Sequence, residues 1–247
     1  MNEIIVKVND LTVAYREKPV LWDIDLEIPR GVMMAVVGPN GAGKSTLIKS
    51  LLEIINPIAG EVTFFDMPYN KARKRIGYVP QRESVDWDFP TTVLDVTLMG
   101  KYGVLGWIKR PSKKDKKEAL DVLKKVGLDG FQDRQISQLS GGQQQRVFLA
   151  RALMQDAEIY FMDEPFQGVD AKTEKAIISV LKEMKKKNKT LIVVHHDLQT
   201  IKEYFDWITI LNIKLVDSGP VDKVYTIENL HKAYGSTLQL SLDEKDD

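Results

Sequence analysis

Residues 38 to 46, GPNGAGKST, contain the residue types that bind the phosphates of a nucleotide. Their spacing fits G-x-x-x-x-G-K-[ST], in which glycines let successive backbone N–H groups approach phosphate oxygens. We expect Lys44 to reach the β- and γ-phosphates and the Ser45 hydroxyl to ligate Mg²⁺. The predicted nucleotide contacts are Gly38, Pro39, Asn40, Gly41, Ala42, Gly43, Lys44, Ser45 and Thr46.

A magnesium site also needs a carboxylate on a neighbouring strand, and IYFMDEP (159 to 165) supplies two acidic residues after four apolar ones. We expect Asp163 to hold the coordination shell of the Mg²⁺ ion. Glu164 comes one residue later and could polarise an attacking water. An apolar run that ends in Asp-Glu is weak evidence alone, but together with residues 38 to 46 it becomes strong evidence for a magnesium site beside bound phosphates.

Two histidines stand side by side in VVHHDL (193 to 198). They could form a metal-ligand pair, or one could act while the other packs. Adjacent residues of a strand point to opposite faces, and the nearby sequence offers no third ligand. We therefore expect the two imidazoles to face opposite sides of the sheet, which disfavours a metal site with both as ligands and leaves open which of them acts.

These residues must be positioned by an α/β core. GVMMAVVG (31 to 38) predicts a strand buried on both faces, followed by the glycine-rich turn and a helix over 44 to 55. Residues 4 to 8, 11 to 15 and 23 to 28 alternate like antiparallel strands. After residue 158, strands and helices alternate, which indicates a mainly parallel sheet. A helical segment at about 82 to 135, with Ser112 as a helix N-cap, interrupts this core.

Composition narrows the class of protein. The 247 residues are enough for one α/β domain with an inserted subdomain. The 35 basic residues balance 35 acidic ones, which argues against a strongly electrostatic nucleic-acid binder. Cysteine is absent, which indicates a reducing compartment, and no apolar run is long enough to span a bilayer. We expect a cytosolic chain unless a membrane protein recruits it.

LSGGQQQR (139 to 146) offers a second helix N-terminus to an anion, at Ser140, Gly141, Gly142 and Gln143. With this motif, the chain resembles the ATP-binding cassette (ABC) ATPases over about residues 5 to 225, read as a nucleotide-binding domain (1–225) with a C-terminal tail (226–247). The resemblance implies the fold of the P-loop nucleotidases, with an N-terminal antiparallel β subdomain and an inserted helical subdomain. It also implies a head-to-tail homodimer, in which each ATP lies between residues 38 to 46 of one copy and residues 140 to 143 of the other.

The same resemblance implies roles for other residues. Tyr15 would stack on adenine, although an edge-strand tyrosine is the alternative. Gln81 would approach Mg²⁺ and water, although it could be a polar loop residue. His196 would contact the γ-phosphate, with Glu164 as general base. Strand alternation then sends His195 to the opposite side of the sheet, where we expect it to pack or to form a local hydrogen bond. Asp170 would act across the dimer, but Phe166 and Gln167 depart from the small residues common before this position, which leaves its detailed role in doubt.

RESVDWDFPTTVLDVTLMGKYG (82 to 103) predicts a surface for a membrane partner around Trp87, Phe89 and Pro90, although both aromatic residues could instead be core. Together with MDEPFQGVDAKTE (162 to 174), this segment resembles ATPase subunits of bacterial importers for first-row metal ions. We expect manganese first, with a zinc or iron importer, or an exporter with separate subunits, as alternatives.

The resemblance further implies permease subunits, a separate metal-binding protein reached only indirectly, no nucleic acid, and a peripheral place on the cytoplasmic face of a bacterial membrane. Two rival classes fit less well. ATPases that act on DNA or ribosomes usually carry two cassettes or a long coiled-coil insertion, whereas a regulator without hydrolysis would be expected to lose Glu164 or the motif at 139 to 146.

Overall fold

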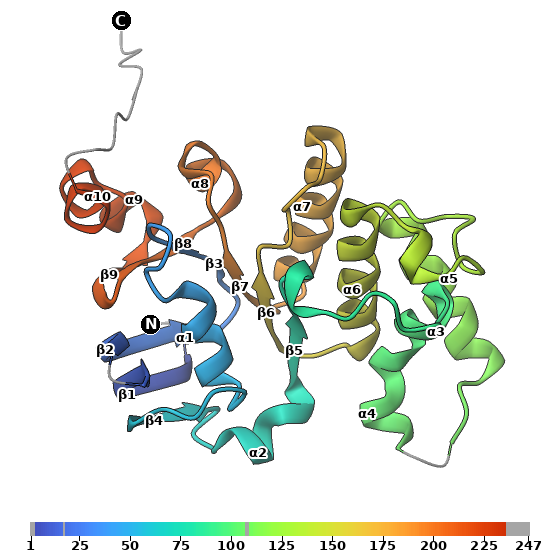
Figure 1. Cartoon of the computed structure of the whole chain (residues 1–247), viewed down its shortest axis with the longest axis horizontal. Coiled ribbons are helices and arrows are strands. Elements are labelled where there is room, and N and C mark those ends of the chain that lie inside the picture. Colours follow the sequence, from blue (N-terminus) through green and yellow to red (C-terminus); the bar gives the residue numbers. More distant parts are fainter. Residues whose placement is uncertain (1–2, 17, 107–108, 236–247) are drawn as a thin grey trace, which may run out of the picture.

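The computed structural model describes residues 3–16, 18–106 and 109–235. Two sheets organise these residues, as Figure 1 shows, with the antiparallel sheet on one side of the central sheet and the inserted helices on the other. The predicted α/β class with an N-terminal antiparallel sheet and a mainly parallel sheet is confirmed.

The antiparallel sheet has the order β2-β1-β4. It consists of β1 (Ile4–Tyr15), β2 (Lys18–Pro29) and β4 (Ala59–Phe64). The two short strands expected over 4 to 8 and 11 to 15 are one strand, whose register against β2 shifts between Val8 and Leu11. Ile24, Leu26 and Ile28 all face the core, as the period-two pattern predicts.

The larger sheet has the order β5-β6-β7-β3-β8-β9 and is parallel except for the β8–β9 pair. Its strands are β3 (Met33–Val37), β5 (Ile76–Val79), β6 (Ile159–Asp163), β7 (Thr190–Val194), β8 (Trp207–Asn212) and β9 (Lys214–Pro220). Met33 and Ala35 of β3 join one hydrophobic core, whereas Met34 and Val36 join the other. The predicted burial of this strand on both faces is therefore confirmed.

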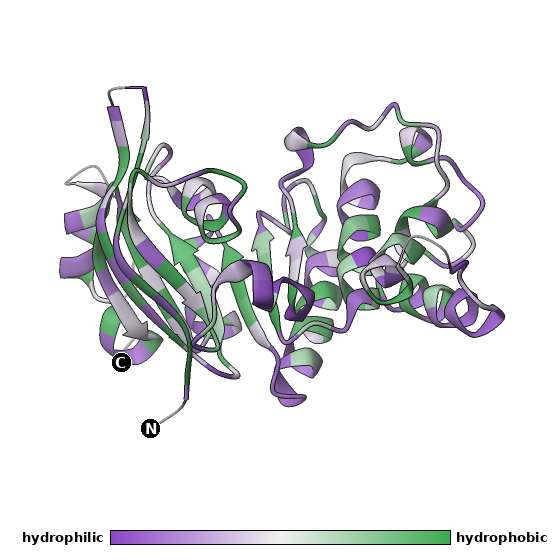
Figure 2. Ribbon diagram, turned by 90° about the horizontal axis from the view of Figure 1, so that it is seen from below, coloured by the Kyte–Doolittle hydropathy of each residue, from purple (hydrophilic) through white to green (hydrophobic). Residues whose placement is uncertain are grey.

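The first core packs helices on one face of this sheet. It includes buried residues of α6 (Gly141–Gln155) and α7 (Ala171–Lys186). The second core joins α1 (Lys44–Leu51) and the antiparallel sheet to the opposite face. Figure 2 shows hydrophobic residues concentrated in the central strands and hydrophilic residues on the outer turns of the helices.

The segment from 82 to 135 is mainly helical, as predicted, and lies at one end of the molecule (Figure 1). Ser112 caps α5 reciprocally with Asp115, which confirms the predicted N-cap. The helices of this segment are α3 (Val93–Leu98), α4 (Tyr102–Leu105) and α5 (Lys113–Lys125). Short 3₁₀ turns occupy Arg73–Arg75, Arg82–Ser84, Met99–Lys101, Ile136–Gln138 and Leu198–Thr200, and the remaining short helices are α2 (Tyr69–Ala72), α8 (Ile201–Tyr204) and α9 (Val221–Val224).

Part of the predicted C-terminal tail forms α10 (Ile227–Tyr234). Leu230 and Ala233 are buried, and Asn212 Nδ2 donates to the Ala233 carbonyl at 2.8 Å. Residues 227 to 234 therefore pack on the core, while the domain boundary at residue 225 stays a prediction. The acidic end, SLDEKDD, lies outside the described residues. Within the described ranges, no helix is both long and apolar enough to cross a bilayer.

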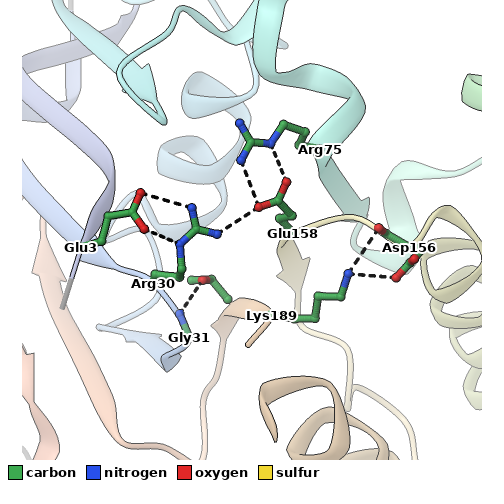
Figure 3. Close-up of polar contacts among 8 residues, drawn as sticks. Glu3, Arg30, Gly31, Arg75, Asp156, Glu158 and Lys189 are labelled. Atoms are coloured by element: carbon green, nitrogen blue, oxygen red, sulfur yellow. Dashed lines mark hydrogen bonds and ion pairs between the residues drawn. The ribbon is translucent and has the colours of Figure 1, made fainter. Parts of the chain in front are cut away.

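An ion-pair network joins the two sheets at the edge where β6 begins (Figure 3). Glu158 accepts hydrogen bonds from Arg75 Nε at 2.6 Å and from Arg30 Nη1 at 2.9 Å, and Arg30 also pairs with Glu3 at 2.7 Å. The two guanidinium groups lower the pKa of Glu158 to about 2. This network ties the end of β2 and the start of β5 to the start of β6, and Asp163 lies at the other end of β6.

Candidate functional site

The loop between β3 and α1 has the backbone that a phosphate-binding loop needs. Gly41 and Gly43 adopt positive φ angles of 79° and 94°, which L side chains rarely accept. A Cβ on Gly43 would also lie 2.6 Å from Leu21 Cδ2 and 2.7 Å from the Val20 carbonyl oxygen. A Cβ on Gly41 would meet nothing within 4 Å. The glycines thus allow β2 to pack closely and leave open space above Gly41.

Lys44 begins α1 and is buried. Its Nζ donates to the carbonyl oxygens of Gly38 at 2.8 Å and Pro39 at 2.9 Å, so the loop folds over the amine. Burial lowers the pKa of Lys44, while the nearby carboxylates of Glu164 and Asp163 oppose that effect. The amine therefore lies close to the two acidic residues that the sequence assigned to the same site.

Ser45 and Asp163 are brought together as predicted. The Ser45 hydroxyl donates to Asp163 Oδ1 at 2.9 Å, while the buried Asp163 Oδ2 has no hydrogen-bond partner among the described residues. Burial raises the pKa of Asp163 because it penalises the charged form. A buried carboxylate oxygen without a donor, beside a hydroxyl, matches the oxygen ligands that Mg²⁺ prefers. The residues present therefore fit a magnesium ion.

Glu164 lies at the centre of the site. Its Oε1 is 2.7 Å from His196 Nε2, and its Oε2 accepts a hydrogen bond of 3.3 Å from Gln81 Nε2. The backbone of Glu164 has a positive φ of 52°, a conformation that L residues adopt only where the surrounding structure holds it. Gln81, which follows β5, and His196, which follows β7, thus meet on the carboxylate of Glu164 although both are distant from it in the sequence.

His195 and His196 point to different surroundings. His195 is buried, and its Nε2 lies 2.7 Å from the Thr200 hydroxyl, whereas His196 contacts Glu164. Along β7, Leu191 and Val193 belong to one core and Ile192 and Val194 to the other, so the two imidazoles continue this alternation. The expectation that His195 packs and forms a local hydrogen bond is confirmed.

The motif at 139 to 146 begins α6 as predicted. Ser140 caps the helix, and its side chain and that of Gln143 each bond to the other's backbone N–H. A hollow of about 570 Å³ is lined by Asn40, Glu164 and His196, among others, but by none of residues 140 to 143. Within one chain, the second helix N-terminus therefore does not line this hollow, and its use by a second copy stays a prediction.

Sequence reasoning missed a set of contacts between α6 and β5. Gln155 Nε2 donates to the Ile76 carbonyl at 2.7 Å, and Arg151 and Gln145 donate to those of Tyr78 and Pro80 at 3.4 Å each. β5 is an edge strand, so its outward carbonyls need donors from outside the sheet. The need of an edge strand for outside donors could have signalled these contacts. The sequence does not reveal, however, which strand lies at the edge of the sheet. These bonds connect α6 to the residue before Gln81.

Two further predicted residues, Tyr15 and Asp170, have other surroundings. Tyr15 is exposed at the end of β1. Asp170 caps α7, accepting from the Thr173 N–H at 3.0 Å and its hydroxyl at 2.6 Å, and these bonds lower the pKa of Asp170. Neither position tests the predicted adenine or cross-dimer role, so both roles stay predictions.

The proposed partner surface needs a correction at Trp87. Its ring packs against Phe148 with centroids 5.0 Å apart, and its Nε1 donates to the Arg82 carbonyl at 2.8 Å. Trp87 therefore packs against the first core, as in the core alternative, although it is only partly buried. Phe89 is 60% exposed and Pro90 is exposed, so they remain available on the surface.

Comparisons with known proteins agree with this geometry. The sequence model of the family described as "ABC transporter" matches residues 21–167. The chain is 59% identical over 237 residues to the zinc transport system ATP-binding protein TroB of Treponema pallidum, covering 96% of this chain and 89% of that protein. It is 57% identical over 239 residues to the manganese transport system ATP-binding protein MntB of Bacillus subtilis, covering 97% and 96%. Its fold is similar to that in the dimeric structure of MJ0796, a bacterial ABC transporter cassette, with a TM-score of 0.76 and 29% identity over 88% of this chain and 99% of that one.

Proposed function

This chain belongs to the ABC transporter family, and on that premise we propose that it is the ATP-hydrolysing subunit of an importer for a divalent transition-metal ion. The observation that carries the import assignment is the identity of 57 to 59% with two metal transport ATP-binding proteins over nearly the whole chain. Manganese is our first choice of ion, and zinc is the second because the two relatives divide between these metals. An iron importer or an exporter with separate subunits would keep the same ATPase chemistry.

We assign phosphate binding to the loop at 38 to 46. The backbone N–H groups of this loop and the Lys44 amine would hold the β- and γ-phosphates, and Tyr15 would stack on adenine. Ser45, Asp163 and Gln81 would hold Mg²⁺, which when bound supplies positive charge that stabilises the departing phosphate oxygens. The unpartnered Oδ2 of Asp163 supports this set of ligands.

We assign the proton transfer to Glu164. Its carboxylate accepts a proton from the attacking water as the water oxygen bonds to the γ-phosphorus. The bond between that phosphorus and the bridging oxygen breaks, and ADP leaves with the bonding electrons. His196 and Gln81 contact the two carboxylate oxygens at 2.7 Å and 3.3 Å, so they hold the base in place and leave one lone pair on each oxygen for the water.

The assembly we propose is a head-to-tail homodimer bound to permease subunits. Residues 140 to 143 of one copy would complete the phosphate site of the other, and the pair would close on ATP and reopen after hydrolysis. Asp170 would lie near the partner copy. A dimeric structure of a related cassette supports this arrangement. The metal ion would pass through the permease from a separate binding protein, on the cytoplasmic face of a bacterial membrane, and this chain need not bind it.

Hydrolysis is tested with Glu164→Gln in the purified full chain. We expect ATP turnover to fall by about 10² to 10⁴-fold, because a positioned general base contributes rate enhancement of that size. ATP binding should persist, and a dimer should accumulate with ATP. Turnover equal to that of the parent chain would overturn the assignment of Glu164.

The cargo is tested by the elemental content of cells that lack the chain, grown in metal-poor medium. These cells are complemented either with the parent chain or with the Glu164→Gln variant. A fall in manganese that only the parent reverses would support the first choice, and a fall in zinc or iron would change the ion. Unchanged contents of all three metals, with other uptake systems deleted, would contradict metal import.

A further inference from the structure

The ring of His195 lies among groups that the proposed mechanism does not use. It is T-shaped against the Phe166 ring, with centroids 5.5 Å apart and an interplanar angle of 90°. The Phe205 ring lies 5.3 Å away on another element. Edge-to-face pairs of this kind hold rings in a defined orientation. His195 is therefore a fixed side chain, with only 5% of its surface exposed.

Hydrogen bonding at Thr200 defines the tautomer of His195. The Thr200 hydroxyl donates its proton to the Asp197 carbonyl at 3.1 Å, so its oxygen must accept from His195 Nε2–H at 2.7 Å. Burial lowers the pKa of His195 to about 4, so the ring is neutral at physiological pH. A neutral ring with a proton on Nε2 satisfies both bonds at once.

These contacts of His195 involve both segments that carry the hydrogen bond between His196 and Glu164. His196 lies between His195 and the turn at 197 to 200. The hydrogen bond between His195 and Thr200 joins the two ends of the stretch from 195 to 200. Phe166 comes two residues after Glu164, in a turn closed by the bond from Gln167 N–H to the Glu164 carbonyl at 3.2 Å. One buried ring thus contacts both segments that carry the two partners.

We propose that His195, held between the Phe166 ring and the Thr200 hydroxyl, is a positioning residue that places His196 against the Glu164 carboxylate. His195, Phe166, Glu164 and His196 line the same hollow, so a shift of the ring would be felt directly at the base. Phe166, one of the two residues that depart from the small residues common before Asp170, contributes the second ring of this aromatic pair. This inference rests on the proposed role of Glu164 and His196.

The experiment measures steady-state ATP turnover of the full chain with Mg²⁺. His195→Phe keeps an aromatic ring but removes the Nε2–H donor, and Thr200→Val removes the acceptor. We expect each to lower kcat about tenfold with KM for ATP unchanged, and the double variant to be no slower than either single one, because both remove the same bond. Thr200→Ser keeps the hydroxyl and should stay within about twofold of the parent chain.

Tyr225→Phe is the matched control. Tyr225 donates to the Leu198 carbonyl at 2.9 Å, so this variant removes a side-chain bond to the same turn that does not pass through His195. Its kcat should stay within about twofold of the parent value, and the unfolding temperature of every variant is recorded so that a loss of fold is recognised.

Epistasis with His196 decides between positioning and general stability. In a His196→Ala background, His195→Phe should lower kcat by less than about twofold further, because the residue through which it acts is gone. A further tenfold loss in that background would overturn the inference, as would parent-like kcat for both His195→Phe and Thr200→Val. Failure of the proposed function is recognised separately, by a Glu164→Gln chain that hydrolyses ATP as fast as the parent.

Discussion

The Ser45 hydroxyl donates a hydrogen bond of 2.9 Å to Asp163 Oδ1, although 118 positions separate the two residues. This bond joins the first turn of α1 to the end of β6, and it leaves Asp163 Oδ2 buried without a partner among the described residues. Burial raises the pKa of Asp163 more than this hydrogen bond lowers it. The Ser45–Asp163 pair defines the most direct test of the magnesium assignment.

Asp163→Asn should separate fold stability from catalysis. Burial raises the pKa of Asp163, so ionisation is less favourable in the folded chain than in the unfolded one, and this cost grows as pH rises above the unfolded pKa. Asparagine removes the cost and can still accept from Ser45. We expect a higher unfolding temperature at pH 7 without Mg²⁺, and ATP turnover lower by about 100-fold because a metal ligand is lost. Asp121→Asn, an exposed change on α5, serves as the control; the magnesium assignment fails if Mg²⁺-dependent turnover survives.

Glu158→Gln should flatten the acid limb of the stability curve. The folded pKa of Glu158 is about 2 against an ordinary 4.5, so its contribution is present above pH 4.5 and is lost as pH falls towards 2. Because the side chain is 37% exposed, the effect should weaken with added salt. Urea unfolding between pH 7 and 3 measures it. Identical pH slopes for the parent and the variant would show that the Arg30–Glu158–Arg75 network adds no stability.

His195 should make the free energy of unfolding depend on pH in a second range, at higher pH than the range set by Glu158. Its folded pKa is about 4 and its ordinary value is 6.5, so stability is fully present above pH 6.5 and is lost as pH falls from 6.5 to 4. The parent chain should lose a few kcal/mol of unfolding free energy across that window. His195→Phe should lack this loss, whereas Tyr225→Phe should keep it, and denaturant titrations at each pH compare the three.

Gly43→Ala should be more damaging than Gly41→Ala. Both residues have positive φ, which costs an alanine about 1 kcal/mol. Only at Gly43 does the new methyl group meet Leu21 and the Val20 carbonyl, which adds roughly 1 to 3 kcal/mol of overpacking. Thermal unfolding and binding of a fluorescent ATP analogue measure the two effects. Equal losses for both variants would mean that the contact with β2 does not matter.

Trp87→Ala and Phe89→Ala should differ in stability. Trp87 packs on Phe148 and is partly buried, so we expect a loss on the order of 2 kcal/mol, below the range for fully buried rings. Phe89 is 60% exposed, so its change should stay within about 0.5 kcal/mol. Chemical unfolding of the two variants provides the comparison. A larger loss for Phe89→Ala would contradict the placement of the two rings.

The features that depend on neighbouring residues could be predicted from the sequence. The glycine spacing before Lys44, the cap at Ser112, the double burial of β3 and the opposite faces of His195 and His196 follow from backbone conformation and side-chain alternation over a few residues. Resemblance to a family, rather than spacing, suggested Gln81 and His196 as partners in the site.

The contacts between distant segments became visible in the three-dimensional fold. The strand order places β5 beside β6 and β6 beside β7, which brings Gln81 and His196 to Glu164 and lets α6 donate to the outer edge of β5. It also turns Trp87 onto α6 and the Phe166 ring onto His195. Local periodicity states that a strand is buried but not which strand lies next to it, because that choice depends on how the whole core packs.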